Sequence, residues 1–368
     1  MRHRMHSICP YFAMFPEDFV QHYAEKYTSP GDRIFDPFSG RGTTLFQSLL
    51  MKRKAAAVDI NPVAFCISRA KAQIPSLERV QDEIELLEQK YYSKARPSLD
   101  EEQRKLPPFF NRAFYHTTLR QLLYLRRILK WHFDPVHCFI AALALGSLHG
   151  ERDRSPYYFS NQMTRTISTK PVYSLKYWRE RELWPHKRDV FSILQARAEY
   201  RLADQEGVRR GSVALADARD AAQVYPRLKN SVRALITSPP YFNMLSYEED
   251  QWLRLWFLGS RPYPSYKQIS SDDRYTSKEK YWLFLQEVWQ GIAPLMQKDS
   301  ILICRLGSVD IQQRDLTIGL KKSLKAAFPK SELLKRPVAS QMGRRQTDQF
   351  LPGSKGCTFE VDYVFALS

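Results

Sequence analysis

The sequence predicts an α/β fold: a parallel sheet with helices on both faces, split by a mostly helical insertion. Near the N-terminus, short apolar segments that end in polar or glycine-containing turns alternate with helical segments, the order from which parallel sheets are built. Similar apolar segments return after residue 206. The stretch between them is basic and aromatic and has helical periodicity. We therefore predict a sheet domain made of residues 1–75 and 206–368, and an insertion over residues 76–205.

The elements of this fold follow from the period of the apolar residues. Before the insertion we expect helices at 16–27, 43–51 and 62–72 and strands at 33–36 and 55–60. After it we expect strands at 212–215, 232–236, 300–305 and 359–366 and a helix at 281–296. Inside the insertion the pattern predicts helices at 78–94, near 119–129 and at 139–148. We expect most of its aromatic side chains Phe109, Phe110, Tyr124 and Trp131 to be core.

The composition narrows the class of protein. With 43% hydrophobic residues the chain is expected to fold, and its formal net charge of +17 favours a polyanionic partner, most often nucleic acid. A basic surface without a specific ligand is the alternative. The five cysteines are dispersed, without metal-ligand spacing, which predicts no metal site and reduced thiols in a cytoplasmic protein. Neither a signal peptide nor an apolar run long enough to span a membrane is expected.

A first motif runs from Asp36 to Thr44, with the sequence Asp-Pro-Phe-Ser-Gly-Arg-Gly-Thr-Thr. Its aspartate ends a predicted strand, at the edge where ligands dock in open α/β sheets. Gly40 and Gly42 allow a tight turn and the close approach of a ligand. The motif lacks the Gly-Lys-Ser/Thr ending of a phosphate-binding loop and a complete G-x-G-x-x-G. It is therefore typical of a nucleotide-cofactor loop that does not bind phosphate.

Two further acids follow strands of the same predicted sheet. Asp59 ends the second strand, where a carboxylate can accept hydrogen bonds from both hydroxyls of a ribose. The alternative is that Asp59 caps the helix that starts at Pro62. Asp217 follows the third strand and is a candidate to contact an adenine ring, or else is a solvated loop acid.

A second motif, Thr237-Ser238-Pro239-Pro240-Tyr241, follows a hydrophobic strand far along the chain. Its two prolines have no N–H donor, which leaves backbone carbonyls as acceptors, and Ser238 adds a side-chain oxygen. Tyr241 offers an aromatic face. Such a pocket suits an amino group on a flat ring, whose nitrogen then needs little acid–base assistance to attack a methyl group. The Pro-Pro pair can also be a purely structural turn.

Together, the two motifs resemble those of amino-methylating DNA methyltransferases. The first is similar to their S-adenosylmethionine loop and the second to their catalytic motif. The segment Tyr11–Pro16 and its helix resemble the part that packs on the methionine end of the cofactor. The resemblance implies a Rossmann-like methyltransferase sheet and S-adenosylmethionine as cofactor. The implied catalytic residues are Ser238, Pro239, Pro240 and Tyr241. The implied cofactor residues are Tyr11, Phe12, Phe15, Asp36, Pro37, Phe38, Gly40, Gly42, Thr43, Thr44, Asp59, Ile60, Asn61, Asp217 and Ala218.

The resemblance also suggests which base is modified. Ser238 as the first residue of the catalytic motif is similar to the members that methylate cytosine N4, with adenine N6 as the alternative. Cytosine carbon-5 chemistry needs a cysteine nucleophile, and the chain has no Pro-Cys motif. A methyltransferase of RNA bases at guanine N2 and a catalytically silent DNA-binding module stay open as further alternatives.

A base inside a duplex cannot reach such a pocket, so the target must be flipped out and the backbone held. Basic and aromatic side chains of the insertion suit this task, with a solvated surface as the alternative. The candidates for contact with DNA, expected to be double-stranded, are Arg152, Arg154, Arg165, Lys170, Lys176, Arg344 and Arg345. A restriction or defence partner is conceivable, and the recognition sequence and oligomeric state stay open.

Overall fold

The computed structural model describes residues 2–11, 15–150, 155–160, 170–203, 208–242, 247–264, 277–308, 311–341, 357 and 359–368, without the side chains of 247–249. The chain divides into two compact units. Unit 1 contains Met1–Phe12, Arg69–Gly207 and Tyr247–Ser265, and unit 2 contains Ala13–Ser68, Val208–Ser246 and Tyr266–Ser368. The division that the sequence predicts, at residues 76 and 205, stays a prediction.

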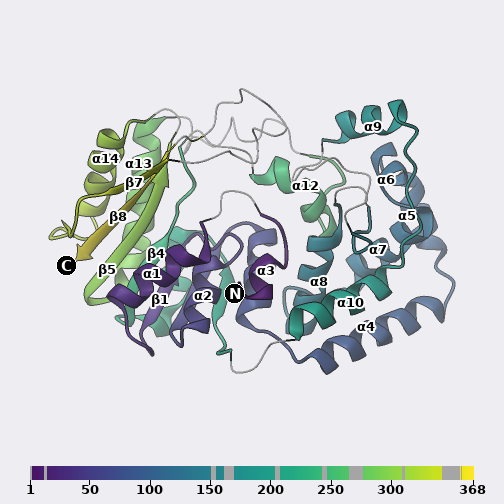
Figure 1. Cartoon of the computed structure of the whole chain (residues 1–368), viewed down its shortest axis with the longest axis horizontal. Helices are drawn as coiled ribbons and strands as arrows, with labels where there is room; N and C mark the ends of the chain where they lie inside the picture. The colour runs from purple at the N-terminus through teal and green to yellow at the C-terminus, as the bar shows by residue number, and fades with distance from the viewer. Residues whose placement is uncertain are drawn as a thin grey trace. The chain divides into compact units, whose positions relative to one another are not determined.

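Unit 2 is built on a mixed sheet. Its strands are β1 (Arg33–Asp36), β2 (Lys54–Asp59), β3 (Ser212–Leu215), β4 (Val232–Thr237), β5 (Met296–Gly307), β6 (Glu332–Leu333), β7 (Val338–Gln341) and β8 (Phe359–Leu367). Their order is β3-β2-β1-β4-β5-β8-β6, with β7 paired to β8. Figure 1 labels β1, β4, β5, β7 and β8 of this sheet. Strands β3 to β5 along this order are parallel, whereas β8 is antiparallel to its neighbours. The predicted α/β class with a Rossmann-like sheet is confirmed.

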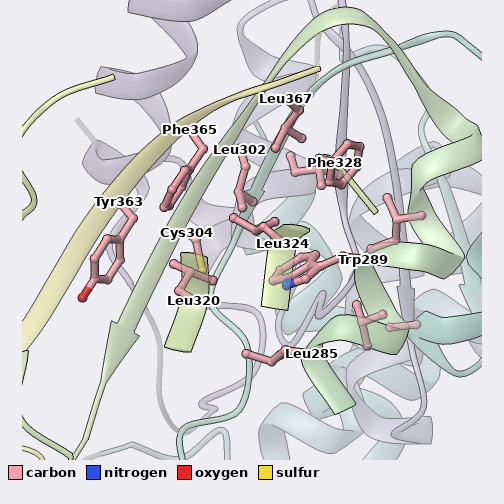
Figure 2. Close-up of a cluster of buried hydrophobic side chains, with 14 of the residues drawn as sticks. Leu285, Trp289, Leu302, Cys304, Leu320, Leu324, Phe328, Tyr363, Phe365 and Leu367 are labelled. Atoms are coloured by element: carbon pink, nitrogen blue, oxygen red, sulfur yellow. The ribbon is translucent and has the colours of Figure 1, made fainter. Parts of the chain in front are cut away.

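Helices cover both faces of this sheet because alternate strand residues point to opposite sides. Ile34 packs with Phe19 and Val20 of α1 (Glu17–Tyr27). Its neighbour Phe35 belongs to the opposite cluster, with residues of α13 (Lys278–Ile292) and α14 (Gln313–Lys325). Figure 2 shows that second cluster, in which Leu285 and Trp289 of α13 and Leu320 and Leu324 of α14 lie against β5 and β8. Helix α2 (Thr43–Leu50) follows β1 and contacts both β1 and β2.

The register between β1 and β4 brings distant parts of the sequence together. Ile34 pairs with Ala234 and Phe35 with Leu235, in parallel. The residues that follow these two strands are those of the two motifs. Strand β1 lies between β2 and β4. Strands β2 and β3 extend the sheet on one side of β1, and the strands from β4 onward extend it on the other side, so the direction of the strand order reverses between β1 and β4. Ligands of open α/β sheets bind beside such a switch point, at the carboxyl ends of the strands.

Unit 1 is mostly helical in its described part. It contains η1 (Arg4–Ser7), α4 (Leu77–Tyr92), α5 (Pro97–Lys105), α6 (Pro108–Ala113), α7 (His116–Ile128), α8 (Pro135–Ser147), α9 (Pro171–Glu180), α10 (Val190–Leu202) and α12 (Tyr247–Phe257). Helix α3 (Pro62–Ala72) begins in unit 2 and ends in unit 1. The aromatic side chains expected in the core, Phe109, Phe110, Tyr124 and Trp131, are all buried. Within the described residues no helix is both long and apolar enough to cross a membrane.

Candidate functional site

Two buried hydrogen bonds join the motifs. The Thr237 hydroxyl donates to Asp36 Oδ1 at 2.7 Å, and the Thr44 hydroxyl donates to the Ile236 carbonyl at 3.0 Å. Each bond connects the first motif to the strand end that leads into the second. Because parallel strands β1 and β4 are neighbours, these bonds hold the two motifs at one edge of the sheet. No role for the hydroxyl of Thr237 was predicted from the sequence.

Asp36 is almost completely buried, and only one of its carboxylate oxygens is satisfied. Oδ1 accepts hydrogen bonds from the Thr237 hydroxyl and, at 3.1 Å, from the Phe38 backbone N–H. Oδ2 is buried and has no hydrogen-bond partner within the described residues. Burial raises the pKa of Asp36 to about 6, although the hydrogen bonds from Thr237 and Phe38 and the nearby Thr44 hydroxyl act in the opposite direction. An oxygen left in this state favours a ligand that donates a hydrogen bond or carries positive charge.

The glycines of the loop have left-handed backbone angles, with φ of 51° at Gly40 and 73° at Gly42. Gly42 precedes the first residue of α2, and a Cβ at this position would lie 2.8 Å from Ser68 Oγ and 3.1 Å from Ser68 Cα. Ser68 in turn donates to the Gly40 carbonyl at 3.0 Å. Gly42 is therefore needed for the turn and for packing on α3. The buried Thr43 accepts a hydrogen bond from Arg41 Nε at 3.2 Å.

Asp59 ties the first loop to the turn after β2. Its Oδ2 accepts from the Gly40 N–H at 2.7 Å and its Oδ1 from the Asn61 N–H at 2.9 Å. Desolvation raises the pKa of Asp59 to about 7, against the lowering effect of both hydrogen bonds. The cap of α3 is Asn61, because the Asn61 side chain accepts from the Val63 N–H at 2.8 Å. The alternative interpretation of Asp59 as that cap is thus wrong, and its carboxylate keeps lone pairs for a further donor.

The residues beside Asp59 and after β3 differ in exposure. The side chain of Ile60 is 62% exposed, an apolar surface directly at the carboxyl edge of the sheet. Asp217 accepts two hydrogen bonds from the Arg219 side chain, at 3.1 and 2.8 Å, and one from the Arg219 N–H. Asp217 is therefore not a simple solvated acid. Ala218 is buried and belongs to the same hydrophobic cluster as Phe35 and Trp289.

In the second motif a chain of hydroxyl hydrogen bonds ends on a carboxylate. The Ser238 hydroxyl donates to the Tyr241 hydroxyl oxygen at 3.3 Å, and the Tyr241 hydroxyl donates to Glu360 Oε1 at 2.8 Å. Tyr241 is only 8% exposed, and burial together with the charge of Glu360 holds its pKa well above the ordinary value. Tyr241 therefore keeps its proton. Because each hydroxyl donates toward Glu360, the lone pairs of Ser238 remain available to accept.

Residues of β5, β8 and α13 surround this chain of hydroxyls. Arg305 lies 3.4 Å from Glu360 and bonds Asp362 through Nε at 2.7 Å, so Glu360 is held in place by a cation. A Cβ on Gly307, opposite Glu360 in the sheet, would come within 2.7 Å of the Tyr241 ring. The Tyr281 hydroxyl donates to the Pro240 carbonyl at 3.0 Å. One of the backbone carbonyls that were expected to accept from a ligand therefore already accepts a hydrogen bond within the protein.

Glu360, Tyr281 and Arg305 were not predicted from the sequence. These residues lie in ordinary strand and helix patterns. The one feature of the sequence that could have indicated a close contact here is Gly307, which ends β5 and leaves room for the Tyr241 ring.

The remaining predicted residues are divided between the two units. Pro37 and Pro239 are buried, and the ring of Phe38 lies 6.1 Å from that of Phe284. Phe15 packs on Phe19 with ring centroids 4.9 Å apart, in unit 2, and Tyr11 is buried in unit 1. The predicted residues Phe12, Arg152, Arg154, Arg165, Arg344 and Arg345 lie outside the described residues.

An aromatic and basic surface surrounds α9 in unit 1, which we call the α9 surface. Lys170 and Lys176 are exposed there, and Lys176 lies 3.7 Å from Glu180. Trp184 is 67% exposed, and the Arg112 guanidinium carbon lies 3.5 Å from the centre of its ring. Tyr173 is also exposed, and Arg181 lies 4.0 Å over the Tyr177 ring. A guanidinium stacked on an exposed ring is typical of surfaces that bind nucleic acid, although it also occurs elsewhere.

Part of the chain is similar in sequence to known methyltransferases. Residues 2–69 match the family model described as DNA methylase. A stretch of 77 residues is 32% identical to the Type II methyltransferase M.MjaII of Methanocaldococcus jannaschii, and covers 21% of this chain and 14% of that relative. The chain thus spans a small part of the relative's length. Over this segment the matches confirm the predicted family resemblance and, with it, the cofactor class, S-adenosylmethionine.

Similar solved structures are methyltransferases of several kinds. TrmN from Thermus thermophilus is 10% identical, with a TM-score of 0.39, and the match covers 99% of this chain and 52% of that chain. The rRNA methyltransferase aviRa from Streptomyces viridochromogenes is also 10% identical, with a TM-score of 0.36 and coverage of 97% and 87%. Likeness at this level carries no argument about function.

Proposed function

We propose that the chain is an S-adenosylmethionine-dependent DNA methyltransferase that modifies an exocyclic amine, cytosine N4 in preference to adenine N6. The observation that carries this proposal is the hydrogen bond from Thr237 to Asp36, which ties the amine motif to the cofactor loop. A methyl donor and its acceptor must come within van der Waals distance, so neighbouring binding sites at one sheet edge suit the transfer.

The residues around the first loop fit the cofactor. Asp36 Oδ2 is a buried acceptor without a partner in the described part of the chain, and it suits the ammonium group of the methionine end. Asp59 has lone pairs left for the ribose hydroxyls, and the exposed Ile60 offers an apolar surface for the adenine ring. Asp217 and Ala218 follow the next strand as adenine contacts. When bound, S-adenosylmethionine supplies an electrophilic methyl group.

The residues of the second motif prepare the amine. The Ser238 hydroxyl donates a hydrogen bond to Tyr241, so its own oxygen can accept a hydrogen bond from the amino group of a base. Acceptors that hold the amine hydrogens favour a pyramidal nitrogen, whose lone pair is then directed at the methyl group. The Pro239 carbonyl is the candidate for the second acceptor, because the Pro240 carbonyl already accepts from Tyr281.

The charge of the molecule supports a nucleic-acid substrate. Lys170 and Lys176 are exposed candidates for phosphate contact on the α9 surface, where Trp184 and Tyr173 can stack on bases. The preference for DNA over RNA rests on the description of the matching family, DNA methylase.

The proposal is tested with methyl-labelled cofactor and purified protein. Duplex DNA and RNA of the same sequences are incubated separately, digested to nucleosides and separated by mass spectrometry. We expect N4-methylcytosine in DNA. N6-methyladenine would replace the proposed base, and label in RNA alone would exclude the DNA assignment. Ser238→Ala should lower transfer while cofactor affinity, measured by calorimetry, is unchanged.

Sequencing of modified bases in the DNA of a host that expresses the protein would give the recognition site. The matched control is a host that expresses the Ser238→Ala variant, because unrelated methylation of the host is present in both. A modified motif seen equally in both hosts would contradict site-specific methylation by this protein.

A further inference from the structure

A cavity of about 620 Å³ lies at the opposite edge of the unit 2 sheet from the candidate active site. Its lining includes Arg33, Lys54 and Ser212, which are the first residues of β1, β2 and β3. The two motifs of the candidate site instead follow the last residues of β1 and β4. The cavity is thus separated from that site by the length of the strands, and its ligand can be identified independently of the proposed function.

The charged side chains that line the cavity are all cationic: Arg33, Lys54, Arg210 and Arg227. No carboxylate is among the lining residues, and within the described part of the chain no ion pair joins these four to an acid. Arg33 donates to the Ser231 hydroxyl at 2.6 Å, and burial lowers its pKa, with no acid to offset that effect. Four cations that have no acidic partner among the described residues, gathered around one cavity, favour a ligand with several negative charges.

The rest of the lining is mainly apolar, apart from Ser212. It includes Val224, Pro226 and Leu228, together with the ring of Tyr225. The Tyr225 hydroxyl donates to the Ala57 carbonyl at 3.0 Å and accepts from Ser212 at 3.2 Å. Its ring is also edge-on to Phe35, with centroids 6.0 Å apart. These contacts fix the Tyr225 ring, so the cavity presents an apolar side next to its cations. Its volume falls within the range of small-molecule sites.

We propose that this cavity binds a nucleotide phosphate, with the phosphates against the four cations and the flat base or sugar against the apolar side. Phosphate oxygens accept hydrogen bonds from arginine and lysine. An inorganic anion would leave the apolar side of the cavity without a contact, whereas the base or sugar of a nucleotide can pack against it. The nucleotide can be free, or it can be one unit of a nucleic-acid strand. Both sources present the same chemistry to the cavity.

The test is isothermal titration calorimetry of the full chain with three probes: ATP, the oligonucleotide pentathymidylate and inorganic tripolyphosphate. Saturating S-adenosylhomocysteine is present so that ATP does not occupy the candidate cofactor loop. The double variant Lys54→Glu/Arg227→Glu removes two lining cations. Its matched control is Lys321→Glu/Lys322→Glu, which makes the same change of charge at exposed positions of α14.

We expect the cavity variant to weaken nucleotide binding by at least about tenfold and the control to change it by less than about twofold, because a lost charged contact has an effect of that size. Weakened ATP binding identifies a free nucleotide as a ligand, and an effect on pentathymidylate alone identifies a strand. Equal effects of the cavity variant and the control would overturn the proposal. So would the absence of binding by ATP and pentathymidylate, or tripolyphosphate binding as tightly as either nucleotide probe. Unchanged melting temperatures show that both variants are folded.

Discussion

Replacement of Tyr241 by phenylalanine tests how the hydroxyl chain acts on the amine. The change keeps the aromatic ring and removes both hydrogen bonds of the Tyr241 hydroxyl, from Ser238 at 3.3 Å and to Glu360 at 2.8 Å. The bond to the charged Glu360 is worth about 1.5–3 kcal/mol, so we expect the free energy of unfolding to fall by about 2 kcal/mol. Arg305 still holds Glu360, which keeps the loss within that range.

The effect of this change on catalysis is transmitted through Ser238. Without the Tyr241 oxygen, the Ser238 hydroxyl has lost its hydrogen-bond acceptor, so its oxygen is no longer fixed as an acceptor for the amine. The loss of one neutral hydrogen bond to the amine, about 0.5–1.5 kcal/mol, corresponds to a fall in kcat of about 2- to 13-fold. Affinity for the cofactor should stay unchanged, because this hydroxyl chain contains none of the proposed cofactor residues.

The assay is methyl transfer to duplex DNA at saturating cofactor, with urea denaturation of the same preparations. The matched control is Tyr363→Phe on β8, whose hydroxyl lies 3.2 Å from Thr317 Oγ1 in the cluster of Figure 2. That variant should lose about 1 kcal/mol of stability and no activity. If Tyr241→Phe lowers stability but leaves kcat at the wild-type value, the proposed positioning of Ser238 is refuted.

Further predictions concern Asp59, Gly42 and Thr237. Because a pKa of about 7 makes Asp59 mostly protonated at low pH, and ribose donors need the ionised form, calorimetry should show S-adenosylhomocysteine affinity falling roughly tenfold from about pH 8 to about pH 6. Asp59→Asn should bind weakly and keep only about the twofold change that Asp36, with its pKa of about 6, causes over this range. The same raised pKa favours the protonated folded state, so the stability of the free protein should decline from about pH 4 to about pH 7, and a pH-independent urea midpoint would contradict this. Gly42→Ala should destabilise the fold by at least about 1–2 kcal/mol through its left-handed backbone and the contact with Ser68, and an unchanged melting temperature would count against the loop geometry. Thr237→Val should cost about 1–3 kcal/mol by removing one of the two donors of the buried Asp36, whereas Thr237→Ser should keep the stability near that of the wild type in denaturation experiments.

Local patterns were sufficient for most of the sheet. The short strands β1 and β3 and the helix α3 have the predicted bounds, because short apolar runs and helical periods with clear turns at both ends specify the length of an element. Strands β6 and β7 and helix α14 were not predicted. Glu332–Leu333 is too short to show a period, and Val338–Gln341 is exposed along its length, so the pairing of both with β8 is decided by tertiary contact.

In the candidate site too, some residues were predictable from local sequence patterns and others were not. The acids at the ends of β1 and β2 and the Ser-Pro-Pro-Tyr turn were recognisable, because strand ends followed by such residues are local signals. The partners of these residues were not. Glu360 is one acid in an alternating strand, and nothing in its neighbours indicates that it accepts a hydrogen bond from Tyr241. Tyr281 similarly has the pattern of an ordinary helix residue.

The sequence by itself determined the fold class, the two motifs and the family resemblance of its first segment, because each depends on the order and spacing of nearby residues. The tertiary structure decided that Thr237 bonds Asp36 and that Tyr241 bonds Glu360. It also brought the first residues of three strands together around the cationic cavity. These contacts join residues distant in the sequence, and the physical reason is strand pairing. Once β1, β4, β5 and β8 are in register, hydrogen-bonding groups at their ends are forced into reach of one another.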